Sequence, residues 1–109
     1  MRPAEEAHLQ VLQLLHEQPE LSQRQLAQKL GVSLGKANYV LRALLERGAI
    51  KAKNFRSSSN KLAYAYLLTP KGIAEKAALT QGYLRRKVAE YEALRSEIDR
   101  LRRDLKSGT

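Results

Sequence analysis

Residues that can hydrogen-bond to a nucleic acid are concentrated in one short stretch of this sequence. An asparagine amide can pair with two major-groove atoms of adenine, and an arginine guanidinium can do the same with guanine. Lysine and arginine neutralise phosphates, and a glycine allows a close approach of the backbone. The residues of the stretch that we expect to contact double-stranded DNA are Ser33, Gly35, Lys36, Asn38, Tyr39 and Arg42.

The other reactive side chains do not form a catalytic pattern. His8 and His16 are eight positions apart, whereas paired metal ligands on one helix are typically four apart, and no third ligand is evident. The sequence has no cysteine, and it shows no nucleophile–base pair, phosphate loop or paired carboxylates. We therefore expect no enzymatic activity, no metal and no cofactor, and we interpret both histidines as structural.

The charge distribution favours a polyanionic partner. The chain has 20 basic and 11 acidic residues in 109, a net charge of +9. Residues 1–30 carry three bases and four acids, residues 31–72 eight bases and one acid, and residues 73–109 nine bases and six acids. The middle third, at +7, is thus the part that we expect to face a polyanion.

Neither a membrane span nor a signal peptide is expected. No apolar run approaches the roughly 18 residues of a spanning helix, and the first residues lack the apolar stretch of a signal peptide. We therefore expect a soluble, cytoplasmic protein.

Helical patterns fill the first half of the chain. Apolar residues at helical spacing predict a first helix that opens near Pro3 and stops at Pro19. Ser22 with Gln25 forms a capping-box pattern that starts a second helix, which ends at Gly31.

A third helix is expected between a Ser33 cap and Gly48. Its buried face is predicted to consist of Ala37, Val40, Leu41, Leu44 and Leu45.

A β-hairpin follows the third helix. Residues 49–54 and 62–68 alternate as strands do, and the polar residues 55–61 between them suggest a loop. Thr69 and Pro70 then cap and open a last helix towards Lys106, with a break or kink near Gly82 left open.

The order of three helices and a hairpin is that of a winged helix-turn-helix, and residues 23–42, QRQLAQKLGVSLGKANYVLR, resemble that motif. Ala27 matches its small residue at the helix crossing and Gly31 its turn. Residues 44–50 and 68–72 resemble the MarR family, most closely the short regulators associated with exopolysaccharide gene clusters. The motif's core positions are matched by Leu26, Leu30, Val32, Ala37 and Val40.

The resemblance implies a fold that is mainly α with a small β-hairpin, a winged helix-turn-helix followed by a long C-terminal helix. Residues 1–72 would form the DNA-binding domain and residues 73–109 a dimerisation helix. Unlike ordinary MarR proteins, the sequence leaves no room for an N-terminal dimerisation helix, so no small-molecule effector is assigned.

Additional DNA contacts are expected from the second helix and from the hairpin tip. Gln23 and Arg24 open the second helix and can hold the DNA backbone, although each is also an ordinary exposed residue. The tip is either a disordered loop or a wing that reaches phosphates or the minor groove. As a wing it would use Lys53, Arg56, Ser58, Asn60 and Lys61.

Several residues of the expected third helix have two possible roles. Asn38 and Arg42 can contact bases or only phosphates, and Tyr39 can touch DNA or pack on the wing. Leu34 can meet a thymine methyl or pack on helix two. Gly35 and Lys36 are unfavourable in a first helical turn, which indicates a functional reason for them.

The last helix has the pattern of a short coiled coil. Acids occupy position g at Glu90, Glu97 and Asp104, and bases occupy position e at Arg95 and Arg102. In a parallel pair these opposite charges meet, whereas an antiparallel pair opposes like charges. The alternative is a helix that packs on its own domain. The predicted seam consists of Leu84, Tyr91, Leu94, Ile98, Leu101 and Leu105.

The sequence therefore predicts a transcriptional regulator that binds a two-fold symmetric operator as a homodimer. The alternative is a winged-helix adaptor that binds protein without sequence-specific DNA binding. The concentration of positive charge in residues 31–72 favours DNA.

Overall fold

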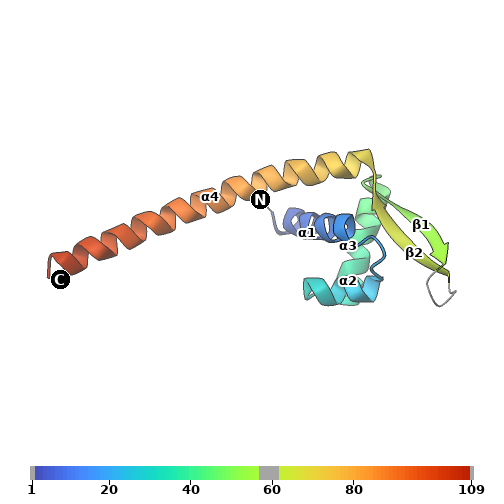
Figure 1. Ribbon diagram of the computed structural model, residues 1–109, viewed down its shortest axis with the longest axis horizontal. Helices are drawn as coiled ribbons and strands as arrows, with labels where there is room; N and C mark the ends of the chain where they lie inside the picture. The colour runs from blue at the N-terminus through green and yellow to red at the C-terminus, as the bar shows by residue number, and fades with distance from the viewer. Residues whose placement is uncertain (1, 57–61, 109) are drawn as a thin grey trace.

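Among the residues that the computed structural model describes, 2–56 and 62–108, three short helices precede a hairpin and one long helix (Figure 1). This order confirms the predicted fold class, mainly α with a small β-hairpin. The elements are α1 (Pro3–Glu17), α2 (Gln23–Leu30), α3 (Leu34–Glu46), β1 (Ile50–Arg56), β2 (Leu62–Leu68) and α4 (Pro70–Lys106).

The predicted caps set the ends of α2 and the start of α3. The Ser22 hydroxyl accepts a hydrogen bond from the Gln25 backbone N–H, and the Gln25 side chain accepts one from the Ser22 N–H. Gly31 ends α2 with φ +69°, a left-handed conformation that glycine adopts without a Cβ penalty. The Ser33 hydroxyl caps α3 by accepting from the Lys36 N–H.

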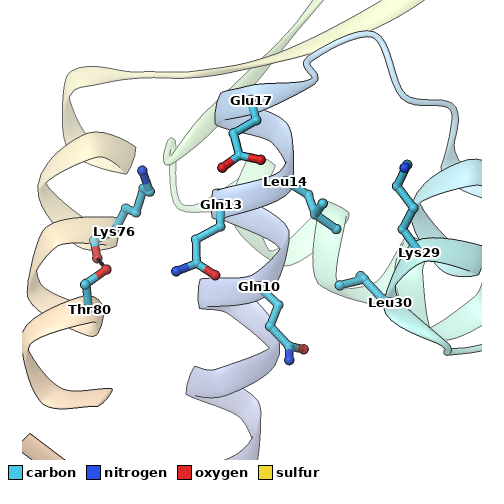
Figure 2. A pocket seen from close by; sticks show the side chains of 8 residues that line it. All are labelled: Gln10, Gln13, Leu14, Glu17, Lys29, Leu30, Lys76 and Thr80. Atoms are coloured by element: carbon cyan, nitrogen blue, oxygen red, sulfur yellow. Dashed lines mark hydrogen bonds between the residues drawn. The ribbon is translucent and has the colours of Figure 1, made fainter. Parts of the chain in front are cut away.

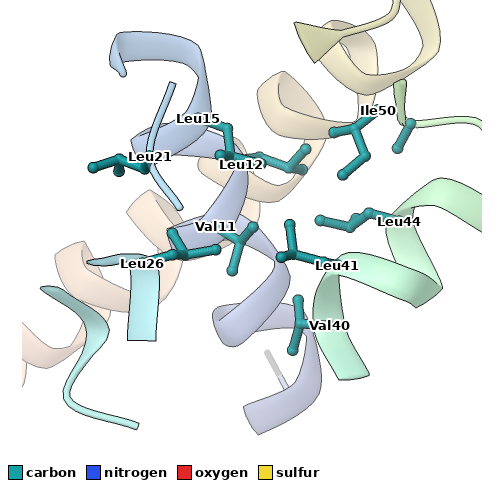
Figure 3. Close-up of a cluster of buried hydrophobic side chains, with 10 residues drawn as sticks. Val11, Leu12, Leu15, Leu21, Leu26, Val40, Leu41, Leu44 and Ile50 are labelled. Carbon is teal, nitrogen blue, oxygen red and sulfur yellow. The ribbon is translucent and has the colours of Figure 1, made fainter. Parts of the chain in front are cut away.

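The core lies where α1, α2, α3 and the start of β1 converge (Figure 3). Apolar side chains at helical spacing form one buried stripe on each helix, and these stripes face one another. Ala27 is buried at the α2–α3 crossing, as the motif predicts. The cluster consists of Val11, Leu12, Leu15, Leu21, Leu26, Val40, Leu41, Leu44, Ala49 and Ile50.

Two residues predicted to be buried are exposed. Leu45 has 36% of its surface exposed, because Leu41 and Leu44 already fill the inward stripe of α3 and position 45 lies beyond it. Val32 is 38% exposed, because it lies in the turn between Gly31 and the Ser33 cap rather than on a helix face.

The hairpin is antiparallel, with a register that runs from Ile50 opposite Leu68 to Arg56 opposite Leu62. The sequence placed Phe55 and Arg56 in the loop, and this was wrong: both belong to β1, because β2 begins early enough to pair with them. The hairpin is also tied to the loop between α1 and α2, where the Tyr66 N–H donates to the Pro19 carbonyl at 2.9 Å.

Helix α4 is a single unbroken helix that passes through Gly82 without a break. Its first half lies beside α1, and Leu79 packs against the core. Its second half extends away from the other elements, so that the molecule measures 70 × 27 × 22 Å (Figure 1).

Candidate nucleic-acid interface

The outer face of α3 carries three of the predicted DNA-contacting side chains in exposed positions. Lys36, Tyr39 and Arg42 are all exposed, and Tyr39 has 69% of its surface free. The Lys36 ammonium group lies 5.9 Å from the centre of the Tyr39 ring, within cation–π distance. Tyr39 and Arg42 border a hollow of about 420 Å³ lined by Gly35, Asn38, Tyr39, Arg42, Ala43 and Glu46.

Gly35 is not required by the packing of this chain. A Cβ built at this position would have only the Ser33 hydroxyl nearby, at 4.0 Å. Its φ also lies outside the left-handed region. Neither crowding nor backbone conformation within the chain therefore requires a glycine here. A requirement for glycine would have to come from contact with another molecule.

Asn38 belongs to a chain of hydrogen bonds across three elements. Its side-chain nitrogen, Nδ2, donates to Gln23 Oε1 at 3.0 Å, and Gln23 Nε2 donates to the Tyr66 hydroxyl oxygen at 3.2 Å. Two predicted site residues, Asn38 and Gln23, are thus brought together. Tyr66 was not predicted as a site residue, because 43 positions separate it from Gln23 and only its strand alternation was visible in the sequence.

The remaining predicted residues of the helical region lie around this face. The Ser33 hydroxyl caps α3 by accepting from the Lys36 N–H, at a helix end of the kind that attracts phosphate. Leu34 is exposed to 44%, and Arg24 at the start of α2 is also exposed.

The predicted wing is described only in part. Lys53 is exposed on β1 opposite Ala65, and Arg56 is the last residue of β1. Ser58, Asn60 and Lys61 lie outside the described residues.

Comparison with known proteins agrees with this geometry. Residues 5–51 match the sequence profile of a family described as winged helix-turn-helix DNA-binding. This chain contains a winged helix-turn-helix domain. No curated protein sequence matches the chain.

Solved structures with the same fold include MarR family regulators. Staphylococcus aureus MarR, solved with salicylate and kanamycin, has a TM-score of 0.61 at 16% identity, over 78% of this chain and 55% of its own. A Mycobacterium tuberculosis MarR family protein with p-aminosalicylic acid gives 0.56 at 28% identity, over 76% of this chain and 63% of its own. The same protein in complex with DNA gives 0.55 at 25% identity, over 77% and 61%. The chain thus spans about 55–63% of the length of these regulators.

Hydrogen bonds join the winged helix-turn-helix domain to α4 through the turn after α3. The Thr69 backbone N–H donates to the Ala49 carbonyl at 3.0 Å, and the Thr69 hydroxyl donates to the Gly48 and Ala49 carbonyls. The same hydroxyl caps α4 by accepting from the Gly72 N–H at 3.1 Å. One threonine therefore connects the turn after α3 to the start of α4.

A charged cluster fixes α1 and α4 to the end of α3. The Arg47 guanidinium pairs with the Glu75 carboxylate and lies 3.0 Å from His8 Nδ1. Partial burial lowers the pKa of His8 below its ordinary value of 6.5, and the Arg47 charge lowers it further, while Glu75 opposes the shift. His8 is therefore neutral near pH 7, with Nδ1 as the acceptor for Arg47.

The predicted seam of α4 is largely exposed in this single chain. Tyr91, Leu94 and Leu101 are 63%, 55% and 52% exposed, and Ile98 is 39% exposed. At position g, Glu90 already accepts hydrogen bonds from Arg86 and Lys87 of its own helix, and the bond from Lys87 lowers the pKa of Glu90. Glu90 can therefore meet a partner's arginine only by sharing or exchanging these bonds.

A groove of about 550 Å³ runs along α1, between α2 and α4 (Figure 2). Lys76 and Thr80 reach it from α4, and Lys29 and Leu30 from α2. Charges of both signs and apolar side chains line it, which does not single out one class of ligand. Its lining residues are Gln10, Gln13, Leu14, Glu17, Lys29, Leu30, Lys76 and Thr80.

Two other kinds of site are not found in the described part of the chain. Among residues 2–56 and 62–108, no three histidine, cysteine or acidic side chains gather as a metal site requires. Within the same ranges, no helix contains an apolar stretch of membrane-spanning length.

Proposed function

We propose that this protein is a sequence-specific transcriptional regulator that binds duplex DNA as a homodimer. The observation that carries the proposal is the outer face of α3: in a winged helix-turn-helix domain, this helix presents Lys36 and Arg42 as exposed side chains, with Asn38 half-exposed between them. A recognition helix enters the major groove with such a face.

Each residue of this face has a distinct role in the proposal. Arg42 reads guanine and Asn38 reads adenine by their paired donors and acceptors. Lys36, at a helix end that already attracts phosphate, adds a charge, and Gly35 allows the backbone to come close. Tyr39 flanks these contacts.

Backbone contacts come from outside α3. Gln23 and Arg24 at the start of α2 contact the phosphates of one DNA strand, and the wing residues contact the phosphates of the other. These contacts set the register of α3 in the groove but carry no sequence information directly.

The dimer forms through the second half of α4. A continuous apolar stripe is exposed on a helix that extends away from a domain with its own completed core. Isolated exposed apolar residues are ordinary, but a contiguous stripe indicates an interface. The occupant is a second copy of the same helix, because its e and g charges are complementary to themselves in a parallel pair. Glu97 then faces the partner's Arg102, and Glu90 faces the partner's Arg95.

A parallel pair places both DNA-binding domains on the same side of the coil. The operator is then two-fold symmetric, with half-sites one helical turn apart, about 10 bp centre to centre, or a multiple of that. In this scheme residues 1–72 read DNA and residues 73–109 dimerise. The resemblance to regulators of exopolysaccharide clusters makes the promoters of such genes the first operators to test.

The structural neighbours support DNA as the ligand. The Mycobacterium tuberculosis MarR family protein, 25% identical to this chain, has been solved in complex with DNA. The second candidate, a protein-binding adaptor, is disfavoured by the net charge of +7 in residues 31–72.

A mobility-shift titration against random and selected duplexes at two salt concentrations tests the proposal. We expect wild-type affinity to fall steeply with salt. We also expect Arg42→Ala to cost about 1–3 kcal/mol on the selected site and to relax preference at one base pair. Arg103→Ala, which removes the same charge from the outer face of α4, serves as the control. Equal binding of random and selected duplexes by the wild type would favour the adaptor, and equal binding of the selected duplex by Arg42→Ala and the wild type would overturn the role of α3.

A further inference from the structure

We infer that Tyr66, on β2, is a positioning residue for base recognition: through Gln23 it holds the Asn38 amide in the orientation that reads adenine. This inference rests on the proposed function of α3. It adds a residue outside both helices of the helix-turn-helix to the reading of sequence.

The hydrogen bonds run in one direction along this chain of three residues. Asn38 Nδ2 donates to Gln23 Oε1 at 3.0 Å, and Gln23 Nε2 donates to the Tyr66 hydroxyl at 3.2 Å. In this arrangement the Tyr66 oxygen is the acceptor, so the nitrogen end of the Gln23 amide faces the strand. The other end of that amide, its oxygen, must then face Asn38 and accept from its nitrogen.

This orientation decides what Asn38 can offer to DNA. One of its two amide hydrogens is used by Gln23, which leaves the carbonyl oxygen and the second hydrogen. Adenine presents an N6–H donor and an N7 acceptor side by side in the major groove, and these match the two remaining groups. If the amide turned over, its oxygen would meet Gln23 Oε1, and two acceptors would face each other.

Tyr66 is itself held firmly enough to serve as the fixed end. Its backbone N–H donates to the Pro19 carbonyl at 2.9 Å, which places it beside the start of α2. Its ring is half-buried and packs against the core. Tyr64, two residues earlier on the same face of β2, is 55% exposed and belongs to neither contact, so it is a matched control.

Tyr66→Phe removes only the hydroxyl acceptor and keeps the ring. We expect the melting temperature and the salt slope to stay close to wild type. Preference for adenine at the Asn38 position should fall about three- to tenfold, the worth of one lost hydrogen bond. Tyr64→Phe should change none of these quantities.

Two further measurements separate this inference from the proposed function. In an Asn38→Ala background, Tyr66→Phe should have no further effect on base preference, because the two residues act as one unit. In the DNA-free protein, the side-chain amide NMR signals of Gln23 and Asn38 should shift with Tyr66→Phe and not with Tyr64→Phe. Unchanged base preference in a Tyr66→Phe protein that still binds its operator specifically would overturn the inference alone. If the wild-type protein shows no preference among DNA sequences, the proposed function is overturned instead.

Discussion

The backbone of Gly72, in the first turn of α4, lies directly against the carbonyl group of Ala49. A Cβ built on Gly72 would come within 1.9 Å of the Ala49 oxygen and 2.9 Å of its carbonyl carbon. Both neighbours are backbone atoms, held in place by the hydrogen bonds of Thr69 to this turn. The contact lets α4 leave the hairpin at a fixed position relative to the end of α3.

Gly72→Ala should therefore destabilise the protein. The turn cannot move away without breaking the Thr69 bonds, so we expect a loss of about 1–3 kcal/mol or more in the free energy of unfolding. Urea denaturation monitored by circular dichroism measures this. A stability equal to wild type would mean that α4 can shift freely at its base.

Gly35→Ala should have the opposite effect on stability. A Cβ at this helical position meets no crowding, so the fold should gain up to about 1 kcal/mol from helix propensity. DNA affinity should fall in the same protein, because the added methyl group holds α3 away from the groove. If Gly35→Ala binds its operator as tightly as wild type, close backbone approach at this position is not part of recognition.

The sequence was most informative where local chemistry decides the structure. The Ser22 capping box, the Gly31 turn and the Thr69–Pro70 helix start each depend on a few neighbouring residues, and all are present as predicted. The hairpin end was misjudged, because cross-strand pairing rather than the polarity of residues 55–56 extends β1.

Contacts between distant residues were not predictable in this way. Tyr66 showed only an alternating strand pattern, and nothing in the sequence linked it to Gln23. His8 was interpreted as structural, and its contact with Arg47, which pairs with Glu75, depends on how α4 returns across α1.

Stability should decrease as the pH falls below about 6.5 because of His8. Burial and the Arg47 charge lower its pKa in the folded chain, whereas the unfolded chain titrates at the ordinary value. Between the folded pKa and pH 6.5, the unfolded state therefore binds more protons than the folded state. The His8 contribution to the free energy of unfolding is complete above pH 6.5 and is lost as the pH falls through the folded pKa. Urea titrations at pH 7.5, 6.5 and 5.5 should show a flatter profile for His8→Gln. Identical slopes for both proteins would assign the pH dependence to other groups.

Ile98→Asp should shift the protein towards monomer. The change places a charge in the middle of the apolar stripe, where an unpaired charge is costly to bury. Sedimentation equilibrium at micromolar concentration should show a wild-type dimer and a largely monomeric variant. Arg103→Asp introduces the same residue on the outer face of the helix and should leave the dimer intact. A monomeric wild type would contradict the dimer, and a dimer unaffected by Ile98→Asp would place the interface elsewhere.

Selection of duplexes from a randomised pool by the full wild-type chain tests the central claim most directly. If α3 reads DNA in a parallel homodimer, the enriched sequences should form an inverted repeat with half-site centres about 10 bp apart or a multiple of that. Each half-site should contain an adenine whose enrichment disappears with Asn38→Ala and a guanine whose enrichment disappears with Arg42→Ala. A pool that stays random after repeated rounds, or one whose enriched motif is the same for wild type and both variants, would contradict the account.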